Sequence, residues 1–254
     1  MHPIFQQTAH RPWPMPTSKC LMYQRWHDLL FAHWPVDAKV LLPFIPPSLQ
    51  LDTFENQAWI GVVPFWMSGI RGRGFPALPY VSRFAEINVR TYVTDGEKPG
   101  VWFFSLDAAN LLAVKIARKY FCLPYFHAHM KCEWQNNSVQ YASRRIHAGA
   151  PRAEFEASYR PVEKAHSAAP GSLEYWLTER YCLYTNDRTG KVCRAEIHHA
   201  PWPLQWADAA ISMNTMTEAA GISLPQTAPL LHFSKFQEVA VWPLRKVGDF
   251  KKRD

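Results

Sequence analysis

The stretch that decides the fold is Phe84-Ala-Glu-Ile-Asn-Val-Arg-Thr-Tyr-Val93. Its residues alternate strictly, and side chains two apart on a strand share a face, about 6.6 Å apart. One face therefore carries Glu86, Asn88 and Arg90 in a row, while the other is core-like. If the polar row faces water, the strand is an ordinary half-buried one. If it faces the inside of a closed sheet, it lines a polar pocket, and such pockets usually serve a ligand.

The composition indicates a globular chain with a substantial core. Of its 254 residues, 48% are hydrophobic and 19% are charged. Residues 1–18 are polar and rich in proline, which predicts an irregular arm. No linker divides the rest, so we expect a single domain over residues 19–247 and a basic tail over residues 248–254.

Several classes of partner are disfavoured by the sequence. The net charge of +7 comes without a nucleic-acid motif, so we expect no nucleic-acid partner. The chain holds no run of eighteen apolar residues and no apolar segment near Met1, so we expect no membrane partner. The five cysteines form no C-x-x-C pair, which favours free thiols and a cytoplasmic location; a disulfide between Cys182 and Cys193 is the alternative.

Hairpin signals recur along the chain. Pairs of alternating or apolar runs flank short polar turns, a pattern that predicts antiparallel strands. We expect paired strands at 49–54 with 58–66, 84–93 with 100–107, 128–134 with 139–145, and 181–185 with 192–198. Single strands are expected at 20–34, 155–159 and 238–242.

Helical periodicity marks two longer segments. Apolar residues recur at every fourth position over 108–121, which Asp107 or a neighbour can cap and which Pro124 ends. The segment 207–220 is also interpreted as a helix, closed by Gly221.

A short helix over 38–42, capped by Asp37, completes the expected elements. Many antiparallel strands with helices set apart predict an α+β fold, predominantly antiparallel β, or a barrel with helical additions. The runs 58–66 and 101–106 are apolar on both faces, and such strands are covered on both sides. A closed or folded-over sheet with covering helices meets that demand.

Familiar catalytic motifs are absent from the sequence. There is no G-x-G-x-x-G, Walker loop, G-x-S-x-G or H-E-x-x-H, which disfavours nucleotide-dependent enzymes and α/β-hydrolases. The pairs His127/His129 and His198/His199 lack a full ligand set, with Cys132 the one further candidate. We therefore expect no metal site and no cofactor.

Glu86 is the strongest candidate for acid/base chemistry. Burial would raise the pKa of its carboxyl group and a neighbouring guanidinium would lower it, a tuning that acid/base sites share with structural ion pairs. Arg118 can meet Tyr125 at a pocket if the end of its helix faces one; a solvated arginine is the alternative. His33 is either a hydrogen-bonded core histidine or a general base.

The order of these parts resembles the acetoacetate decarboxylase-like superfamily. A glutamate strand, a strand ending in Asp107, a helix with Arg118 and the spacing Phe121-x-x-Pro124 follow one another. Within the superfamily the chain is most similar to the uncharacterised YqjF-like family over residues 20–245. The motifs that carry this resemblance are His33-Trp-Pro-Val36, Glu86-Ile-Asn-Val-Arg-Thr-Tyr-Val93, Phe103-Phe-Ser-Leu-Asp-Ala108 and Leu123-Pro-Tyr125. The resemblance implies a double-layered β-barrel or cone around a small cavity, often in a homo-oligomer.

The resemblance also implies a chemical departure. In the decarboxylases a lysine after the helix-end proline forms a Schiff base beside a second lysine, but here those positions are Tyr125 and Phe126. Lys115 and Lys119 are poor substitutes. We therefore expect no Schiff-base decarboxylation.

Other decarboxylase site residues are matched in part. The resemblance assigns the cavity glutamate to Glu86 and the helix arginine to Arg118. The N-terminal arginine of the decarboxylases has no clean match, because Arg25 is two positions off and His27 lies nearer.

The expected site is therefore an acid/base cavity. Glu86, Tyr125 and Arg118 are its candidate catalytic residues, and its candidate ligand-binding residues are Asn88, Arg90, His33, His27 and Phe126. Three functions stay open: a lyase, hydratase or isomerase of small oxo or hydroxy acids, a non-catalytic module that binds a small molecule, and a structural protein.

Overall fold

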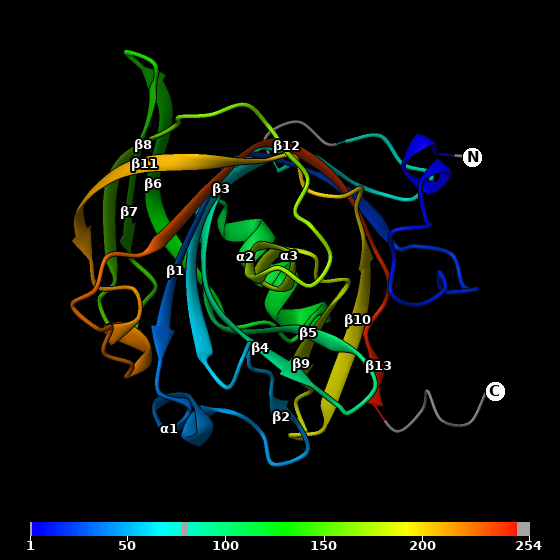
Figure 1. Cartoon of the computed structure of the whole chain (residues 1–254). Helices are drawn as coiled ribbons and strands as arrows, with labels where there is room; N and C mark the ends of the chain where they lie inside the picture. Colours follow the sequence, from blue (N-terminus) through cyan, green and yellow to red (C-terminus); the bar gives the residue numbers. More distant parts are fainter. Residues whose placement is uncertain (1, 78–80, 248–254) are drawn as a thin grey trace.

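The protein is built around one closed β-sheet (Figure 1). The computed structural model describes residues 2–77 and 81–247, so the expected basic tail at 248–254 lies outside the described residues. Within this part of the chain the sheet has 13 strands. Its pairings are antiparallel except that β5 runs parallel to β6 and to β9. This confirms the α+β, predominantly antiparallel fold.

The strands close into two rings that share one wall. The small ring consists of β1 (Met22–Val36), β3 (Ala58–Gly72), β4 (Phe84–Thr94), β5 (Pro99–Ala108), β9 (Cys182–Asn186), β10 (Val192–His198) and β12 (Leu230–Val241). The large ring uses the wall β12–β1–β3–β4–β5 again and adds β6 (Tyr125–Gln135), β7 (Ser138–Arg145), β8 (Glu154–Pro161) and β11 (Leu204–Asn214). The double-layered barrel is thereby confirmed.

Shorter elements cover and connect the rings. They are β2 (Gln50–Leu51), β13 (Arg245–Lys246), α1 (Ala38–Leu41), α2 (Leu111–Tyr120), α3 (Leu173–Thr178), and the 3-10 turns η1 (Pro3–Gln6), η2 (Leu42–Phe44) and η3 (Glu218–Ala220). Figure 1 looks through the small ring, and α2 and α3 cross the view within its outline. The helix α2 supplies the crossover that a parallel pair such as β5 and β6 requires.

The large ring is filled with side chains. Ile87 and Val89 of β4 pack there with Tyr141, Phe155 and Phe233, and each of these five is at most 2% exposed. Alternate residues of β4 therefore belong to a solid apolar core, which is the main stabilising feature on this side of the wall.

The helix expected over 207–220 is wrong. The structure has the strand β11 there, followed by η3, and Gly221 adopts φ 78° at the end of η3. Along β11, Ala207, Ala209 and Ile211 pack against the core while the residues between them are exposed. The period is that of a strand, and packing overrode the high helix propensity of alanine.

Two other expectations on local structure need correction. The strand expected over 49–54 shrinks to β2, which pairs with β4 and not with β3. The helix α2 begins after Asn110 and not at 108, and its cap is Asn110, a neighbour of Asp107, whose side chain accepts a hydrogen bond from the Ala113 amide. The other three predicted hairpins are confirmed, as is α1 with its Asp37 cap.

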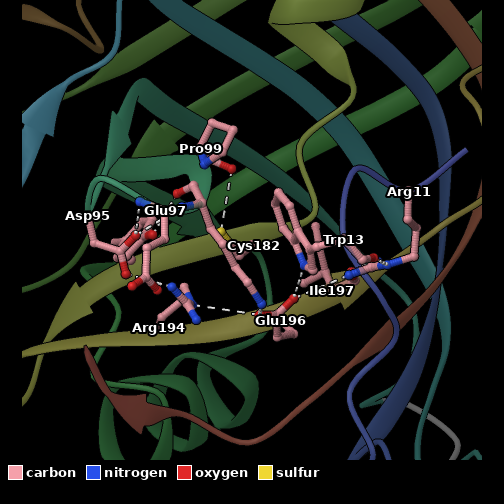
Figure 2. Close-up of polar contacts among 11 residues, drawn as sticks. Arg11, Trp13, Asp95, Glu97, Pro99, Cys182, Arg194, Glu196 and Ile197 are labelled. Atoms are coloured by element: carbon pink, nitrogen blue, oxygen red, sulfur yellow. Dashed lines mark hydrogen bonds and ion pairs between the residues drawn. The ribbon is translucent and has the colours of Figure 1, made fainter. Parts of the chain in front are cut away.

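The N-terminal arm is fastened to β10 by buried polar contacts (Figure 2). The carboxylate of Glu196 accepts hydrogen bonds from Arg11 Nη2 at 3.2 Å and from Trp13 Nε1 at 2.8 Å. Lys98 Nζ donates to the same carboxylate at 2.8 Å, and Arg11 Nη1 donates to the carbonyl oxygen of Ile197 at 2.7 Å. The arm is thereby held against the small ring.

Candidate functional site

The small ring encloses a cavity of about 620 Å³. Its wall is mainly apolar and aromatic, with side chains from β1, β3, β4, β5 and α2 that include Leu29, Phe31, Phe65, Met67, Phe103 and Phe121. Exposed residues line one end of the cavity, where Phe75 is 72% exposed and Ile116 of α2 is 44% exposed. That end is the mouth, and the other end is buried. Cavities of this size and polarity are typical of small-molecule sites.

The polar row of β4 faces this cavity. Glu86, Asn88 and Arg90 all line it, and their exposed fractions are 3%, 5% and 9%. Ile87 and Val89, which alternate with them, face the core of the large ring. Both faces of β4 are thus interior, so the half-buried, water-facing alternative does not hold.

Glu86 and Tyr125 form a hydrogen-bonded pair on the cavity wall. Tyr125 opens β6, directly after Pro124, and its hydroxyl donates to Glu86 Oε2 at 2.8 Å. Burial raises the pKa of Glu86 to about 8, the Tyr125 hydroxyl opposes this rise, and the charge of Asp107 adds to it. Burial also holds the pKa of Tyr125 well above its usual value, so the phenol stays protonated. At neutral pH the pair is uncharged and keeps the carboxyl proton of Glu86 for donation.

Arg90 is a buried cation that lacks a carboxylate partner among the described residues. Its contacts are a long hydrogen bond of 3.5 Å from Nη2 to the Leu177 carbonyl oxygen and the rings of Phe31 and Tyr92, at 5.4 and 5.9 Å. Its Nε and the Oδ1 of Asn88 have no hydrogen-bond partner in the described part of the chain. Arg180 Nη2 and Trp202 Nε1, which also line the cavity, lack a partner in this part of the chain too, so buried polar atoms of the kind that are normally satisfied gather on this wall.

Arg180 also lines this end of the cavity. No sequence motif had marked it as a candidate site residue. Its Nη1 pairs with Asp52 Oδ2 at 2.6 Å, its Nε donates to the Trp176 carbonyl oxygen at 2.6 Å, and its Cζ lies 4.7 Å from the ring of Tyr92. Burial lowers its pKa, against the charge of Asp52. Unlike Arg90, it is already neutralised.

The two candidate histidines lie outside the cavity lining. His33 is fully buried beside it, with Nε2 2.7 Å from the hydroxyl of Tyr92. Burial and the charge of Arg90 hold its pKa well below the usual value, so it is a neutral core histidine. His27 stacks on Trp66 with centroids 3.9 Å apart and lies 2.8 Å from Ser68 Oγ. Neither is brought to the pair of Glu86 and Tyr125.

Arg118 and Phe126 also lie outside the lining. Arg118 is on the exposed side of α2 and donates to the carbonyl oxygen of Tyr125 at 2.6 Å, while the cavity side of α2 carries Ala113 and Ala117. Phe126 turns to the other face of the strand, where the guanidinium of Arg145 lies 4.0 Å above its ring. The structure therefore assembles Glu86, Tyr125, Asn88 and Arg90 and leaves these two apart.

Other classes of site are not seen in residues 2–77 and 81–247. This part of the chain has no cluster of three or more His, Cys, Asp or Glu side chains placed to hold a metal ion. It also has no helix with the length and apolarity that a bilayer span requires. All five cysteines are free thiols.

Solved structures with the same architecture define the class of fold. An acetoacetate decarboxylase superposes with a TM-score of 0.65 at 12% identity, covering 91% of this chain and 90% of that one. The enduracididine biosynthesis enzyme MppR, solved with pyruvate, superposes with a TM-score of 0.61 at 10% identity over 92% and 93%. Identity this low shows the fold alone, which is that of the acetoacetate decarboxylase-like proteins.

Sequence comparison defines the family. The model of DUF2071, a family of uncharacterised conserved proteins, matches residues 23–238. The uncharacterised protein YqjF of Bacillus subtilis strain 168 is 50% identical over 232 residues, which cover 91% of this chain and 95% of YqjF. The chain belongs to this family, as the resemblance predicted.

Proposed function

We propose that the protein binds a small oxo or hydroxy acid in the small ring and transfers a proton on it with Glu86 and Tyr125. The observation that carries the proposal is the hydrogen-bonded pair of these two side chains on an apolar cavity wall. A carboxyl group whose pKa is raised to about 8 by burial is a competent acid below that pH and a competent base above it.

The pair suits chemistry at a carbon next to a carbonyl group. The protonated Glu86 donates its O–H to the ligand's carbonyl oxygen, or its carboxylate accepts the proton that the neighbouring carbon loses. Tyr125 stabilises either form through its 2.8 Å hydrogen bond. Such steps occur in lyases, hydratases and isomerases, and they need no covalent intermediate.

A Schiff base has no donor in this cavity. In the described part of the chain no lysine lines it, and Lys115 and Lys119 are exposed on α2. The side chains at the positions that resemble the decarboxylase lysines, Tyr125 and Phe126, have no amine. The proposed reaction class is therefore acid/base chemistry without imine formation.

A non-catalytic binding module in the same barrel is the alternative. It is favoured by Arg90 and Asn88, whose unpartnered atoms would serve a ligand whether or not a reaction follows. MppR holds pyruvate in its solved structure, which suggests an oxo acid as the first ligand to try.

The test is proton exchange. Pyruvate or 2-oxobutanoate is incubated with the protein in D₂O, and loss of the proton signal at the carbon next to the carbonyl is followed by NMR. We expect exchange that Glu86→Gln slows by about 100-fold or more and that Tyr125→Phe slows less.

Glu133→Gln, on the exposed part of β6, is the matched control and should exchange at the wild-type rate. Equal rates for wild type and Glu86→Gln would overturn the catalytic role. Binding of the acid without any exchange would leave the binding module as the function.

A further inference from the structure

We infer that the ligand of the small ring is an elongated, amphipathic carboxylate. Its carboxylate binds at Arg90, and an alkyl or aryl body runs past Glu86 and Tyr125 toward the mouth beside Phe75. This rests on the proposed function only in that both concern the same cavity.

The position of the carboxylate follows from charge. Arg90 and Arg180 are both buried at the inner end of the cavity, but Arg180 has Asp52 at 2.6 Å and Arg90 has no carboxylate within ion-pair distance among the described residues. An unpaired buried charge is unfavourable, whereas one with an anion bound bidentately is stable. The unpartnered Nε of Arg90 is a further donor for this carboxylate, whereas the unpartnered Oδ1 of Asn88 accepts and would need a donor elsewhere on the ligand.

The length of the ligand follows from the strand. Glu86 and Arg90 are four residues apart on β4, which places their Cα atoms roughly 13 Å from each other. Phe84, Phe75 and the exposed Ile116 of α2 line the cavity beyond Glu86. A molecule that contacts Arg90 and also fills the space beside Glu86 is therefore longer than pyruvate.

The body of the ligand follows from volume and polarity. A cavity of about 620 Å³ is of the size that holds drug-sized molecules, and a three-carbon acid would leave most of it empty. Between the polar groups the wall consists of side chains such as Leu29, Phe65 and Phe103. Their burial contributes to affinity only against an apolar partner.

The wall around Arg90 is close-packed on the side of β3 and irregular on the side of β5. Gly61 of β3 pairs with Arg90, and a Cβ there would lie 2.8 Å from His33 Cδ2 and 3.6 Å from Arg90 Cγ. On the other side of β4, the pairing of β4 with β5 contains a β-bulge: Val89 pairs with Ser105 but Arg90 pairs with Phe103. Bulges of this kind re-aim side chains next to binding sites.

The experiment is a binding series measured by calorimetry with butanoate, hexanoate, octanoate and decanoate. We expect affinity to rise about fourfold per added methylene until the chain reaches the mouth, and then to level off. An affinity that is independent of chain length would overturn the inference, since the cavity would then hold water beside a short acid.

The Arg90→Met variant tests the head group. It should bind octanoate at least tenfold more weakly than wild type and should no longer prefer octanoate to 1-octanol. Arg160→Gln, at the exposed end of β8, is the matched control and should bind as wild type does. If Arg90→Met does not fold, the preference of the wild-type protein for octanoate over 1-octanol decides, and equal affinities would refute the assignment.

Failure of this inference is distinguishable from failure of the proposed function. If Glu86-dependent proton exchange occurs with short oxo acids but longer chains bind no better, the reaction stands and the elongated ligand does not. If affinity grows with chain length and depends on Arg90 while no exchange occurs, the ligand class stands and the reaction does not.

Discussion

The two faces of β4 give opposite results from the same backbone. On one face Ile87 and Val89 pack into the filled interior of the large ring. On the other face Glu86 and Arg90 line the cavity of the small ring. Apolar side chains pack against one another and exclude space. Packing unpaired polar groups against apolar side chains costs free energy, so the face of β4 that carries them borders a cavity and not a filled core.

The contrast extends to the buried arginines of the two rings. In the large ring Arg145 is bound bidentately by Asp107, with both N–O distances at 2.7 Å. In the small ring Arg90 contacts the Leu177 carbonyl oxygen and the side chains of Phe31 and Tyr92, and it has no carboxylate partner among the described residues. Arg145 thus has its counter-ion in the same interior, whereas Arg90 has none in the described part of the chain, as the proposed carboxylate ligand requires.

The largest expected effect comes from breaking the ion pair of the large ring. Asp107→Ala should lower the free energy of unfolding by about 3–5 kcal/mol, because it leaves the guanidinium of Arg145 buried without a partner. Arg90→Met should change it by less than about 1 kcal/mol, since no carboxylate loses a partner. Urea denaturation measures both, and equal losses would remove the distinction between the two arginines.

A matched pair of truncations tests how solid the two interiors are. Ile87→Ala, in the core of the large ring, should cost about 2–5 kcal/mol of stability because it opens a void among close-packed side chains. Ile197→Ala, on the cavity wall, should cost clearly less, because that side chain already borders empty space. Thermal and urea unfolding of both variants give the comparison. A larger loss for Ile197→Ala would contradict it.

The pH dependence of the free energy of unfolding should report the raised pKa of Glu86, which lines the cavity. The pKa of Glu86 is about 8 in the folded protein against 4.5 for the free side chain, so the folded state holds this proton more tightly. Its stabilising contribution is complete below about pH 4.5 and is lost as the pH rises through about 8.

Wild type should therefore lose on the order of 1–3 kcal/mol more than Glu86→Gln between about pH 5 and about pH 9. Denaturation curves at several pH values measure the difference between the two proteins. Parallel curves would show that Glu86 is ionised throughout.

The smallest effect is expected outside both interiors. Arg118 is exposed and contacts the carbonyl oxygen of Tyr125 and the ring of Phe126, both outside the cavity lining. Arg118→Gln should therefore alter octanoate affinity by less than about twofold and stability by less than about 1 kcal/mol. Calorimetry and urea denaturation check the two values. A tenfold loss of octanoate affinity would show that Arg118 contributes to ligand binding.

The alternation of polar and apolar residues predicted the strand over 84–93 correctly. Over 207–220, where alanine is frequent, the sequence was interpreted as a helix and the prediction was wrong. The polar row of 84–93 indicated the pocket strand directly, because a strand has only two faces. Over 207–220 the alanines favoured a helix, although Ala207, Ala209 and Ile211 also alternate with exposed residues as a strand requires. The burial period of a strand, and not the helix propensity of alanine, decides the structure of this segment.

The site was only partly predictable for a different reason. Glu86 and Tyr125 meet through a parallel pairing of β5 and β6 beside β4. The resemblance assigned both residues to one cavity, but neither it nor the pattern predicted the parallel pairing. The face that α2 turns toward the cavity depends on tertiary packing, so the sequence left open whether Arg118 meets the pocket or solvent, and the structure has it exposed. Arg180 and Asp52 come together from positions 128 apart in the sequence, and no local signal marks them.

The shared wall has a consequence for how such a protein can change. Because 85, 87 and 89 of β4 belong to the core while 84, 86, 88 and 90 line the cavity, substitutions at 86, 88 or 90 can change the cavity lining without repacking 85, 87 or 89. The positions that form the core and the positions that line the cavity thus alternate along residues 84–90 of the strand. Relatives with this barrel can diverge in chemistry while they keep their architecture, and a designer can use the odd positions as a fixed frame and the even ones as a library.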